Sequence, residues 1–167
     1  ELPNLTNVQY TYIENKNNNE LTRLIKIYYK NKKNIDLKNN HLLLIEKGMN
    51  GLKARARTIN ELSEMSSFYI ETSPIPLDKK SKKILNGDNI LLLKTYSNQL
   101  NKLDIWNKEN IEKDIKIYCQ NNNLNLGKLA LPLRAAITGK SVSPGLYELM
   151  EVLGKNEIIT RINNINN

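Results

Sequence analysis

Side chains that carry covalent or metal chemistry are scarce in this sequence. Its 167 residues include one cysteine, Cys119, and one histidine, His41. A lone cysteine excludes an internal disulfide, and one His with one Cys provides no His/Cys metal set and no Cys–His nucleophile pair. Cys119 shares a helical pattern with Ile111 and Ile115, so we interpret it as a small core residue and not as a nucleophile.

Long apolar runs are also lacking. The longest, 42–45 and 90–93, fall far below the roughly 18 residues that a membrane-spanning helix needs. No signal peptide is visible, so we expect no membrane partner and a cytoplasmic location. The chain starts at Glu1 without Met, which indicates a fragment or a processed chain.

Positive charge, in contrast, is in excess. The net charge is +8 and the pI is near 9.5. A polyanion is therefore the first partner to consider, because each neutralised phosphate releases counterions. The alternative is that an AT-rich coding bias, visible in the abundance of Asn, Lys and Ile, made the whole surface basic. Hydrophobic content of 40% over this length supports one or two small globular domains.

Helical periodicity recurs along the chain, and strand patterns are weak. Apolar residues from Leu21 to Tyr29 follow the spacing of an amphipathic helix, with Asn-rich residues 17–19 before it as caps. Thr58 and Glu61 have the spacing of a capping box at another helix start. We therefore predict an all-α fold of seven or eight helices. Further helices are expected over 88–103, from Asn107, over 129–137, from Ser143 and around 158–165.

Two closely spaced prolines mark the best domain boundary. Pro74 and Pro76 disfavour a helix and stiffen the connection. We expect two small helical subdomains, residues 1–77 and 78–167. The lysine-rich run 78–83 follows the boundary. We interpret it as a solvated helix face, with a phosphate-facing patch as the alternative.

Basic side chains crowd the predicted helix start at Thr58. Lys53, Arg55 and Arg57 precede it and bring cationic donors close to the free N–H groups of a helix N-terminus. Arginine can stack on an unpaired base while it hydrogen-bonds the base edge, which is how single-stranded RNA loops are read. On these residues alone, a pair of surface arginines before a helix is the simpler interpretation.

A second segment, 126–154, places one arginine in an apolar helical run. Arg134 must snorkel from that face or point at a partner. Pro132 is tolerable only in the first turn of the helix. Nine residues after Arg134 comes Ser143-Pro144-Gly145-Leu146, which predicts Ser143 as an N-cap with Pro144 at the first helical position. Gly154 is the expected stop of that helix.

These two segments resemble the C-terminal anticodon-binding region of bacterial glutamyl-tRNA synthetases, which are class I aminoacyl-tRNA synthetases. Residues 53–62 are similar to the family's Arg-x-Lys/Arg-Thr-Leu-x-Glu-Leu motif, with Ile59 in place of Leu. Residues 127–154 are similar to the extreme C-terminal domain. Asn7 and Tyr10 resemble the Asn-x-x-Tyr that follows the catalytic signature loop. The resemblance implies an all-α, anticodon-binding helical bundle or cage.

The resemblance also implies roles for individual residues. An arginine of the first subdomain reads the third anticodon base, with Arg55 as first choice and Arg57 as second. Arg134 contacts the loop, and the Ser143–Leu146 turn approaches the middle base, where Gly145 removes a side chain, Ser143 offers a hydroxyl and the helix start offers N–H donors. Residues that we expect to contact phosphate are Lys53, Lys128, Lys140 and Arg161, the last with a structural role as the alternative.

Catalytic signatures of the family are absent from these residues. No His-Ile-Gly-His, Lys-Met-Ser-Lys-Ser or zinc-binding Cys cluster occurs. We therefore expect a monomeric module without cofactor or metal that binds the tRNA(Glu) anticodon stem-loop. Its N-terminal catalytic domain, with ATP and Mg, would carry out glutamate–tRNA ligation.

Two alternatives remain. The first is a basic all-helical adaptor that binds an acidic partner without RNA sequence specificity. The second is a self-contained enzyme that uses Glu61 and Glu64 or Glu148 and Glu151, although such spacing is common on solvated helix faces.

Overall fold

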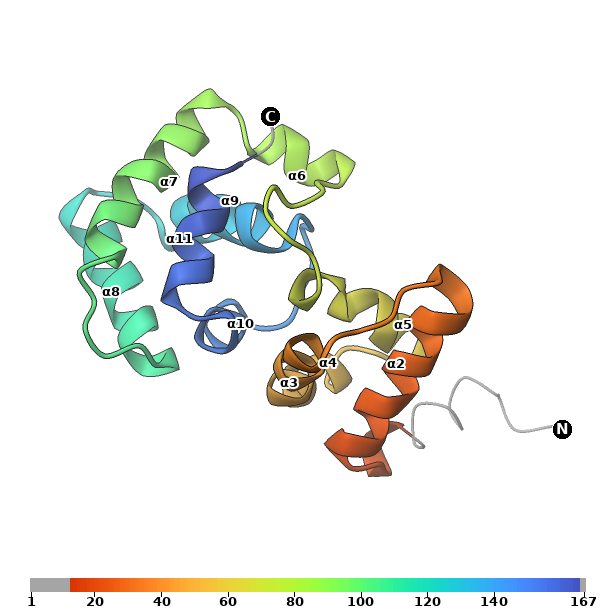
Figure 1. The fold of residues 1–167 in the computed structure, drawn as a ribbon. Helices are drawn as coiled ribbons and strands as arrows, with labels where there is room; N and C mark the ends of the chain where they lie inside the picture. Colours follow the sequence, from red (N-terminus) through yellow and green to blue (C-terminus); the bar gives the residue numbers. More distant parts are fainter. Residues whose placement is uncertain (1–12, 166–167) are drawn as a thin grey trace, which may run out of the picture. The chain divides into compact units, whose positions relative to one another are not determined.

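The computed structural model describes residues 13–165, and helices form the regular structure there (Figure 1). No strand occurs within these residues, which confirms the predicted all-α class. The resemblance noted at Asn7 and Tyr10 lies outside the described residues. The chain divides into two compact units after Ile70.

The first unit packs short helices against one long amphipathic helix. That helix begins at the N-cap Asn17, whose side chain accepts a hydrogen bond from the Glu20 N–H at 2.8 Å, as the Asn-rich sequence predicts. Its stripe buries Leu21 and Ile25 completely. Two further helices were not predicted, because the apolar run 42–45 is contiguous and lacks a helical period. The elements are α2 (Asn18–Lys33), α3 (Asn39–Lys47), α4 (Met49–Lys53), α5 (Ile59–Met65) and the 3-10 helix η1 (Ser66–Tyr69).

The start of α5 carries a modified capping box. Thr58 is the N-cap, and its hydroxyl accepts a hydrogen bond from the Glu61 N–H at 3.0 Å. The Glu61 carboxylate accepts from the N–H of Arg57 at 2.7 Å, one residue earlier than the standard box would place it. The cap therefore also holds the backbone of Arg57, one of the predicted base readers.

The second unit surrounds one central helix. α9 packs against α6, α7, α8 and α11 (Figure 1). Its side chains Leu129, Leu133 and Ile137 are fully buried. Asp78, Asn86 and Asn107 each cap a helix by accepting from the N–H three residues later. The helices are α6 (Lys79–Ile84), α7 (Gly87–Leu100), α8 (Lys108–Asn121), α9 (Leu126–Thr138), α10 (Leu146–Leu153) and α11 (Lys155–Asn163).

The segment before α6 packs onto the second unit. Ile75 is buried, and the N–H of Asp78 donates to the carbonyl of Gly139 at 2.8 Å. A Cβ added at Gly139 would lie 1.9 Å from the carbonyl oxygen of Pro76. From the sequence we expected the boundary between the subdomains after residue 77. In the structure the first compact unit ends earlier, at Ile70, because this close packing makes residues 71–77 part of the second unit.

Two helix starts differ from the prediction. α9 begins at Leu126, so Pro132 lies inside the helix and not in its first turn. Pro132 has no N–H, which deprives the Lys128 carbonyl of its usual helical donor. α10 begins at Leu146 with Gly145 as its N-cap, so the prediction of Ser143 as cap and Pro144 as first helical residue was wrong.

The Gly154 stop, in contrast, is confirmed: this residue ends α10 with φ of 86° and leads directly into α11.

Candidate nucleic-acid interface

Arg134 joins α9 to the turn that precedes α10. Its Nη1 atom donates to the carbonyl oxygens of Pro144 at 2.6 Å and of Ser143 at 3.4 Å, and also to the Ser143 hydroxyl. The Ser143 hydroxyl donates in turn to the Pro144 carbonyl at 3.1 Å. Ser143 does not cap α10, because the helix begins at Leu146 and its N-cap is Gly145; the Ser143 hydroxyl contacts Arg134 and the Pro144 carbonyl. The structure thus brings together Arg134 and the predicted turn.

The turn residues differ in what they can offer a ligand. Ser143, Pro144 and Leu146 are buried, and Leu146 is 5% exposed, so its side chain belongs to the core. Gly145 is half-buried, and a Cβ added there would lie 3.6 Å from the nearest atom, a carboxylate oxygen of Glu148. Packing within this chain therefore does not require glycine at position 145. The backbone of the turn is therefore available to a ligand, while the buried side chains of Ser143 and Leu146 pack inside the unit.

A cavity of about 300 Å³ opens between α9 and the start of α10. It contains an aromatic side chain, Tyr147, which the sequence analysis missed, although an aromatic residue directly after a predicted contact turn is a usable signal. Burial raises the pKa of the Tyr147 phenol, and the nearby Glu112 raises it further, so the hydroxyl stays protonated at neutral pH. The cavity is lined by Lys108, Ala130, Arg134, Gly145, Leu146, Tyr147 and Glu148.

An ion pair stands at the edge of this cavity. Lys108 Nζ lies 2.9 Å from Glu148 Oε1, and hydrogen bonding to Glu148 raises the pKa of Lys108. The backbone N–H of Lys108 donates to Glu151. The carboxylates that sequence spacing offered as a catalytic pair are thus engaged with one lysine. The cavity thus combines an aromatic ring and a guanidinium, on which an unstacked base can stack, with polar side chains that can hydrogen-bond the base edge.

Three predicted phosphate contacts have different surroundings. Lys128 is exposed on α9. Lys140 is half-buried and lies near Asp78, whose carboxyl pKa it helps to lower. Lys53 belongs to the first unit, where its Nζ donates to the Asn18 side chain at 2.9 Å. Lys128 therefore has the most accessible charge of the three.

Arg161 is a structural residue. It is 2% exposed, and its guanidinium donates to the carbonyl oxygens of Ile137 at 2.6 Å and Glu71 at 3.0 Å. Its Nε atom pairs with Glu157 at 2.9 Å. A phosphate cannot reach a guanidinium enclosed in this way, so the structure corrects the predicted phosphate contact and supports the structural alternative.

Arg55 and Arg57 form a separate basic cluster in the first unit. Both side chains are exposed and follow the end of α4. The Arg55 N–H donates to the Leu52 carbonyl at 3.1 Å, and the Arg57 N–H is held by Glu61. Their backbones are thus fixed while their charged ends face solvent, which suits a contact with an external anion. Which of the two reads a base stays a prediction.

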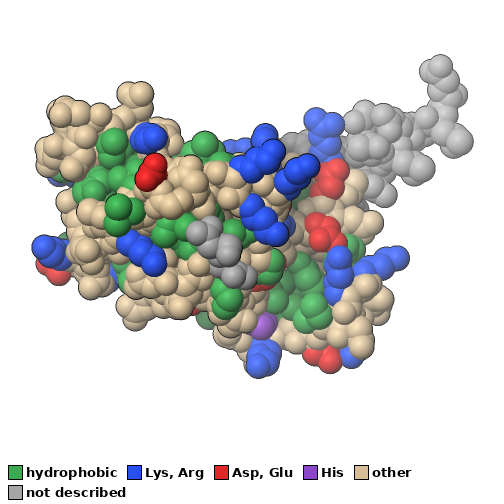
Figure 2. Space-filling view, turned by 90° about the horizontal axis from the view of Figure 1, so that it is seen from above, with side chains coloured by type: hydrophobic (Ala, Val, Ile, Leu, Met, Phe, Trp, Pro, Cys, Tyr) green, Lys and Arg blue, Asp and Glu red, His purple; other side chains and the backbone are tan. Residues whose placement is uncertain are grey.

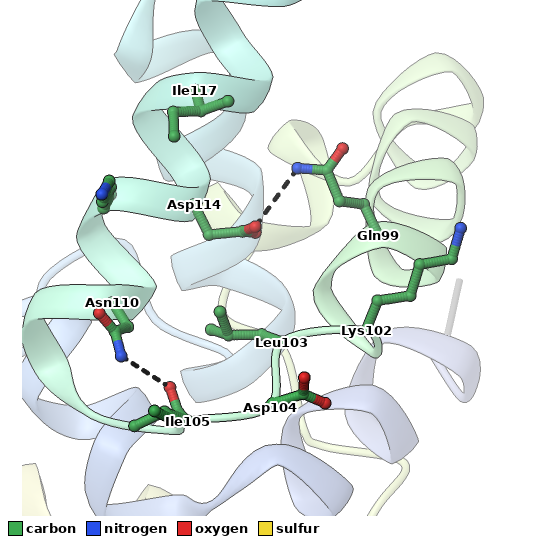
Figure 3. Close-up of a pocket in the computed structure, with 9 residues that line it drawn as sticks. Gln99, Lys102, Leu103, Asp104, Ile105, Asn110, Asp114 and Ile117 are labelled. Carbon is green, nitrogen blue, oxygen red and sulfur yellow. Dashed lines mark hydrogen bonds between the residues drawn. The ribbon is translucent and has the colours of Figure 1, made fainter.

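A larger cavity, of about 470 Å³, has a different character (Figure 3). Asp114 accepts hydrogen bonds from Gln99 at 3.3 Å and from the Tyr96 hydroxyl at 2.8 Å. Asp104 lines the same hollow (Figure 3). Its two carboxylates are balanced by two lysines, Lys102 and Lys113, so the cavity carries no net positive charge to attract a phosphate, and we do not assign it to a nucleic acid. Its lining residues are Gln99, Lys102, Leu103, Asp104, Ile105, Asn110, Lys113, Asp114 and Ile117.

Two other kinds of site are not found between residues 13 and 165. No group of three or more His, Cys, Asp or Glu residues there is placed to hold a metal ion. Within the same residues, no helix has both the length and the apolar character needed to cross a membrane.

Comparison with known proteins identifies the relatives of this chain. A family model described as "Anticodon binding domain" matches residues 14–166. "Glutamate--tRNA ligase 2" of Rhodospirillum rubrum is 30% identical over 162 residues, which are 97% of this chain and 35% of that protein. "Glutamate--tRNA ligase 2" of Zymomonas mobilis is 35% identical over 158 residues, covering 95% of this chain and 33% of that protein.

The fold has a solved counterpart. The crystal structure of a glutamate tRNA ligase from Elizabethkingia meningosepticum has a TM-score of 0.74 and 24% identity, and it covers 93% of this chain and 30% of that one. This chain therefore spans about a third of the length of the curated relatives it matches. The resemblance to glutamyl-tRNA synthetases that the sequence suggested is confirmed.

Proposed function

Because the chain belongs to the anticodon-binding domain family, we propose that it binds tRNA and recognises the anticodon stem-loop of tRNA(Glu). In this proposal it gives tRNA specificity to glutamate–tRNA ligation in the cytoplasm. An N-terminal catalytic domain of the same enzyme would use ATP and Mg for the reaction, and the module itself would act as a monomer without a cofactor.

The link between Arg134 and the Ser143–Pro144 carbonyls is the observation that carries this proposal. An arginine held by three acceptors loses less side-chain freedom when it binds a ligand, so more of its interaction energy appears as affinity. The same link fixes the turn that ends at Gly145. A base placed in the adjacent cavity would meet the guanidinium, the turn backbone and the Tyr147 ring together.

Other predicted residues take supporting roles in the proposal. Arg55 or Arg57 would read the third anticodon base from the first unit. Lys53, Lys128 and Lys140 would hold phosphates, which fix the position of the RNA without reading its sequence. Each lost base contact is expected to cost about 1–3 kcal/mol, the range for base-edge contacts in other complexes.

Binding to anticodon stem-loops tests the proposal. The glutamate-tRNA stem-loop is compared with copies in which the second or the third anticodon base is changed, at two salt concentrations. Arg134→Ala removes the positioned guanidinium, and Arg134→Lys keeps its charge. Arg23→Ala is a matched control, because Arg23 is an exposed arginine on α2 in the other unit.

We expect the unchanged protein to prefer the unaltered loop. Both Arg134 variants should lose most of the preference over the loop changed at the second base, and Arg23→Ala should keep it. Equal binding to every loop, with affinity that collapses in salt, would contradict the proposal. That result would favour a basic helical adaptor for an acidic partner.

A further inference from the structure

Four lysines occupy four of the six positions of α6. Lys79, Lys80, Lys82 and Lys83 are all exposed, and we call them the α6 lysine patch. In the described part of the chain, none of the four makes an ion pair or a side-chain hydrogen bond. Figure 2 looks onto the molecule from above and shows Lys and Arg side chains gathered over this helix. The patch is therefore a concentration of accessible, uncompensated positive charge.

The one carboxylate at the start of α6 does not neutralise the patch. Asp78 is the N-cap, and its Oδ1 atom accepts from the Ser81 N–H at 2.7 Å. Its Oδ2 atom faces the Ser141 N–H at 3.3 Å. Both oxygens thus accept from backbone amides, and among the described residues no ion pair joins Asp78 to any of the four lysines.

The patch is unfavourable for the helix that carries it. Lys79 lies three and four residues before Lys82 and Lys83, spacings at which like charges repel. Lys79 and Lys80 also stand in the first turn, where the helix dipole disfavours cations, whereas Lys82 and Lys83 stand in the last turn, where it favours them. Fully buried Ser81 and Leu85 hold the helix in place against this repulsion. An external polyanion would remove it.

The patch is connected directly to the candidate interface of the same unit. The Asp78 N–H donates to the Gly139 carbonyl, and the Asp78 carboxylate faces the Ser141 N–H. Gly139 ends α9, and the chain runs from Ser141 into the turn at Ser143 that Arg134 holds. The helix that bears the four lysines is therefore tied by hydrogen bonds to the segment that delivers the base-contact turn.

We propose that the α6 lysine patch binds phosphates of the RNA strand that flanks the bases held at the Arg134 turn, an inference that rests on the proposed function. An ammonium group on a long flexible stem suits phosphates as a point charge, whereas it lacks the planar fork that reads a base edge. The patch supplies affinity for RNA and makes that affinity depend on salt, whereas discrimination between bases comes from Arg134, the turn at Gly145 and Arg55 or Arg57.

The test uses two charge-matched variants. The patch variant combines Lys79→Gln, Lys80→Gln, Lys82→Gln and Lys83→Gln. The control combines Lys26→Gln, Lys32→Gln, Lys47→Gln and Lys94→Gln, four lysines that are exposed on α2, α3 and α7. Both variants lose the same net charge. A double variant, Lys79→Gln with Lys80→Gln, removes the first-turn cations, which should not weaken the helix, so a loss of affinity in it cannot come from unfolding.

Affinity for the glutamate-tRNA stem-loop and for its base-changed copies is measured from low to high salt. The slope of log affinity against log salt falls by about 0.7 to 0.9 for each phosphate contact removed. We expect the patch variant to lose roughly 3 to 4 in slope and the double variant roughly 1 to 2. Each of these two variants should lose the same factor of affinity for every loop, so its preference among the loops is kept. The slope and affinity of the control should change much less.

Three results would overturn the inference. The patch variant could match the control, which would make the effect one of net charge. Its slope could stay unchanged. It could bind the RNA normally but lose binding to poly-L-glutamate, which would assign the patch to an acidic protein. Failure of the proposed function looks different, because the unchanged protein would then fail to distinguish the loops at any salt concentration.

Discussion

Arg161 and Ile137 are joined by a hydrogen bond of 2.6 Å from a buried guanidinium to a backbone carbonyl. This bond attaches α11 to the last turn of α9, and a second bond, to the Glu71 carbonyl, attaches the segment before α6. Three parts of the second unit that are distant in the sequence therefore meet at one side chain. Such a residue contributes to folding and not to ligand binding.

Arg161→Ala should destabilise the protein by about 3 kcal/mol, because it leaves two carbonyls without a donor and removes the partner of Glu157. The measurement is urea-induced unfolding of the variant beside the unchanged protein. RNA discrimination of the folded fraction should not change. If the variant had normal stability but bound RNA more weakly, the result would support Arg161 as the phosphate contact that the sequence suggested.

Gly139 is expected to tolerate no side chain. Its φ is +71°, and an added Cβ would lie 1.9 Å from the Pro76 carbonyl oxygen. Gly139→Ala should therefore cost about 2 kcal/mol or more, since both backbone strain and the close approach oppose it. Gly87→Ala is the matched control, because nothing lies within 4 Å of its added Cβ, and it should be neutral or slightly stabilising. Equal thermal unfolding midpoints for the two variants would show that the backbone at Pro76 moves away from the added Cβ at little cost.

His41 should make the stability of the first unit depend on pH. Its Nδ1 atom accepts a hydrogen bond from the Lys38 N–H at 3.3 Å, which requires the neutral ring. Burial, and then the neighbouring Lys38, lower the pKa of His41 below its usual 6.5. The unfolded chain therefore binds a proton more readily, and stability is lost as the pH falls through about 6.5.

The measurement for His41 is the urea midpoint at about pH 7.5 and about pH 5 for the unchanged protein and for His41→Gln. The difference between the two pH values should be smaller in the variant. An identical difference in both proteins would assign the pH dependence to the carboxylates.

Tyr147 should contribute to RNA affinity through its ring. Base stacking on an aromatic side chain is worth about 1–3 kcal/mol, so Tyr147→Ala should weaken binding of the stem-loop by roughly tenfold, whereas Tyr147→Phe should bind nearly normally. Fluorescence anisotropy with a labelled stem-loop gives both affinities. Equal losses in the two variants would indicate that the hydroxyl, and not the ring, makes the contact.

The helical elements with a clear period and cap could be predicted from the sequence. Asn17, Thr58 and Asn107 act as caps where their spacing indicates. α3 and α4 were missed because the contiguous apolar run 42–45 hides the helical spacing of the fully buried Ile45, Met49 and Leu52. At Ser143 a local rule gave the wrong helix start: α10 begins three residues later, and the hydroxyl that was expected to cap it contacts Arg134 of another helix.

The candidate site divides in the same way. Arg134 and the turn at Gly145 could be proposed from residue types and the motif, and the structure adds that they contact each other. The burial of Arg161 could not, because one of its acceptors, Glu71, lies 90 positions away in the sequence. For the α6 lysines the sequence left a solvated helix face and a phosphate-facing patch open, and the structure adds that both oxygens of Asp78 face backbone amides.

The sequestered thiol of Cys119 has a practical consequence. This side chain is 4% exposed, and burial raises the pKa of its thiol, so it is a poor nucleophile at neutral pH. A second cysteine introduced at an exposed position such as Lys128 would react with a maleimide dye far faster than the native one. The protein therefore accepts a fluorophore at one chosen point of its surface without prior removal of its own cysteine.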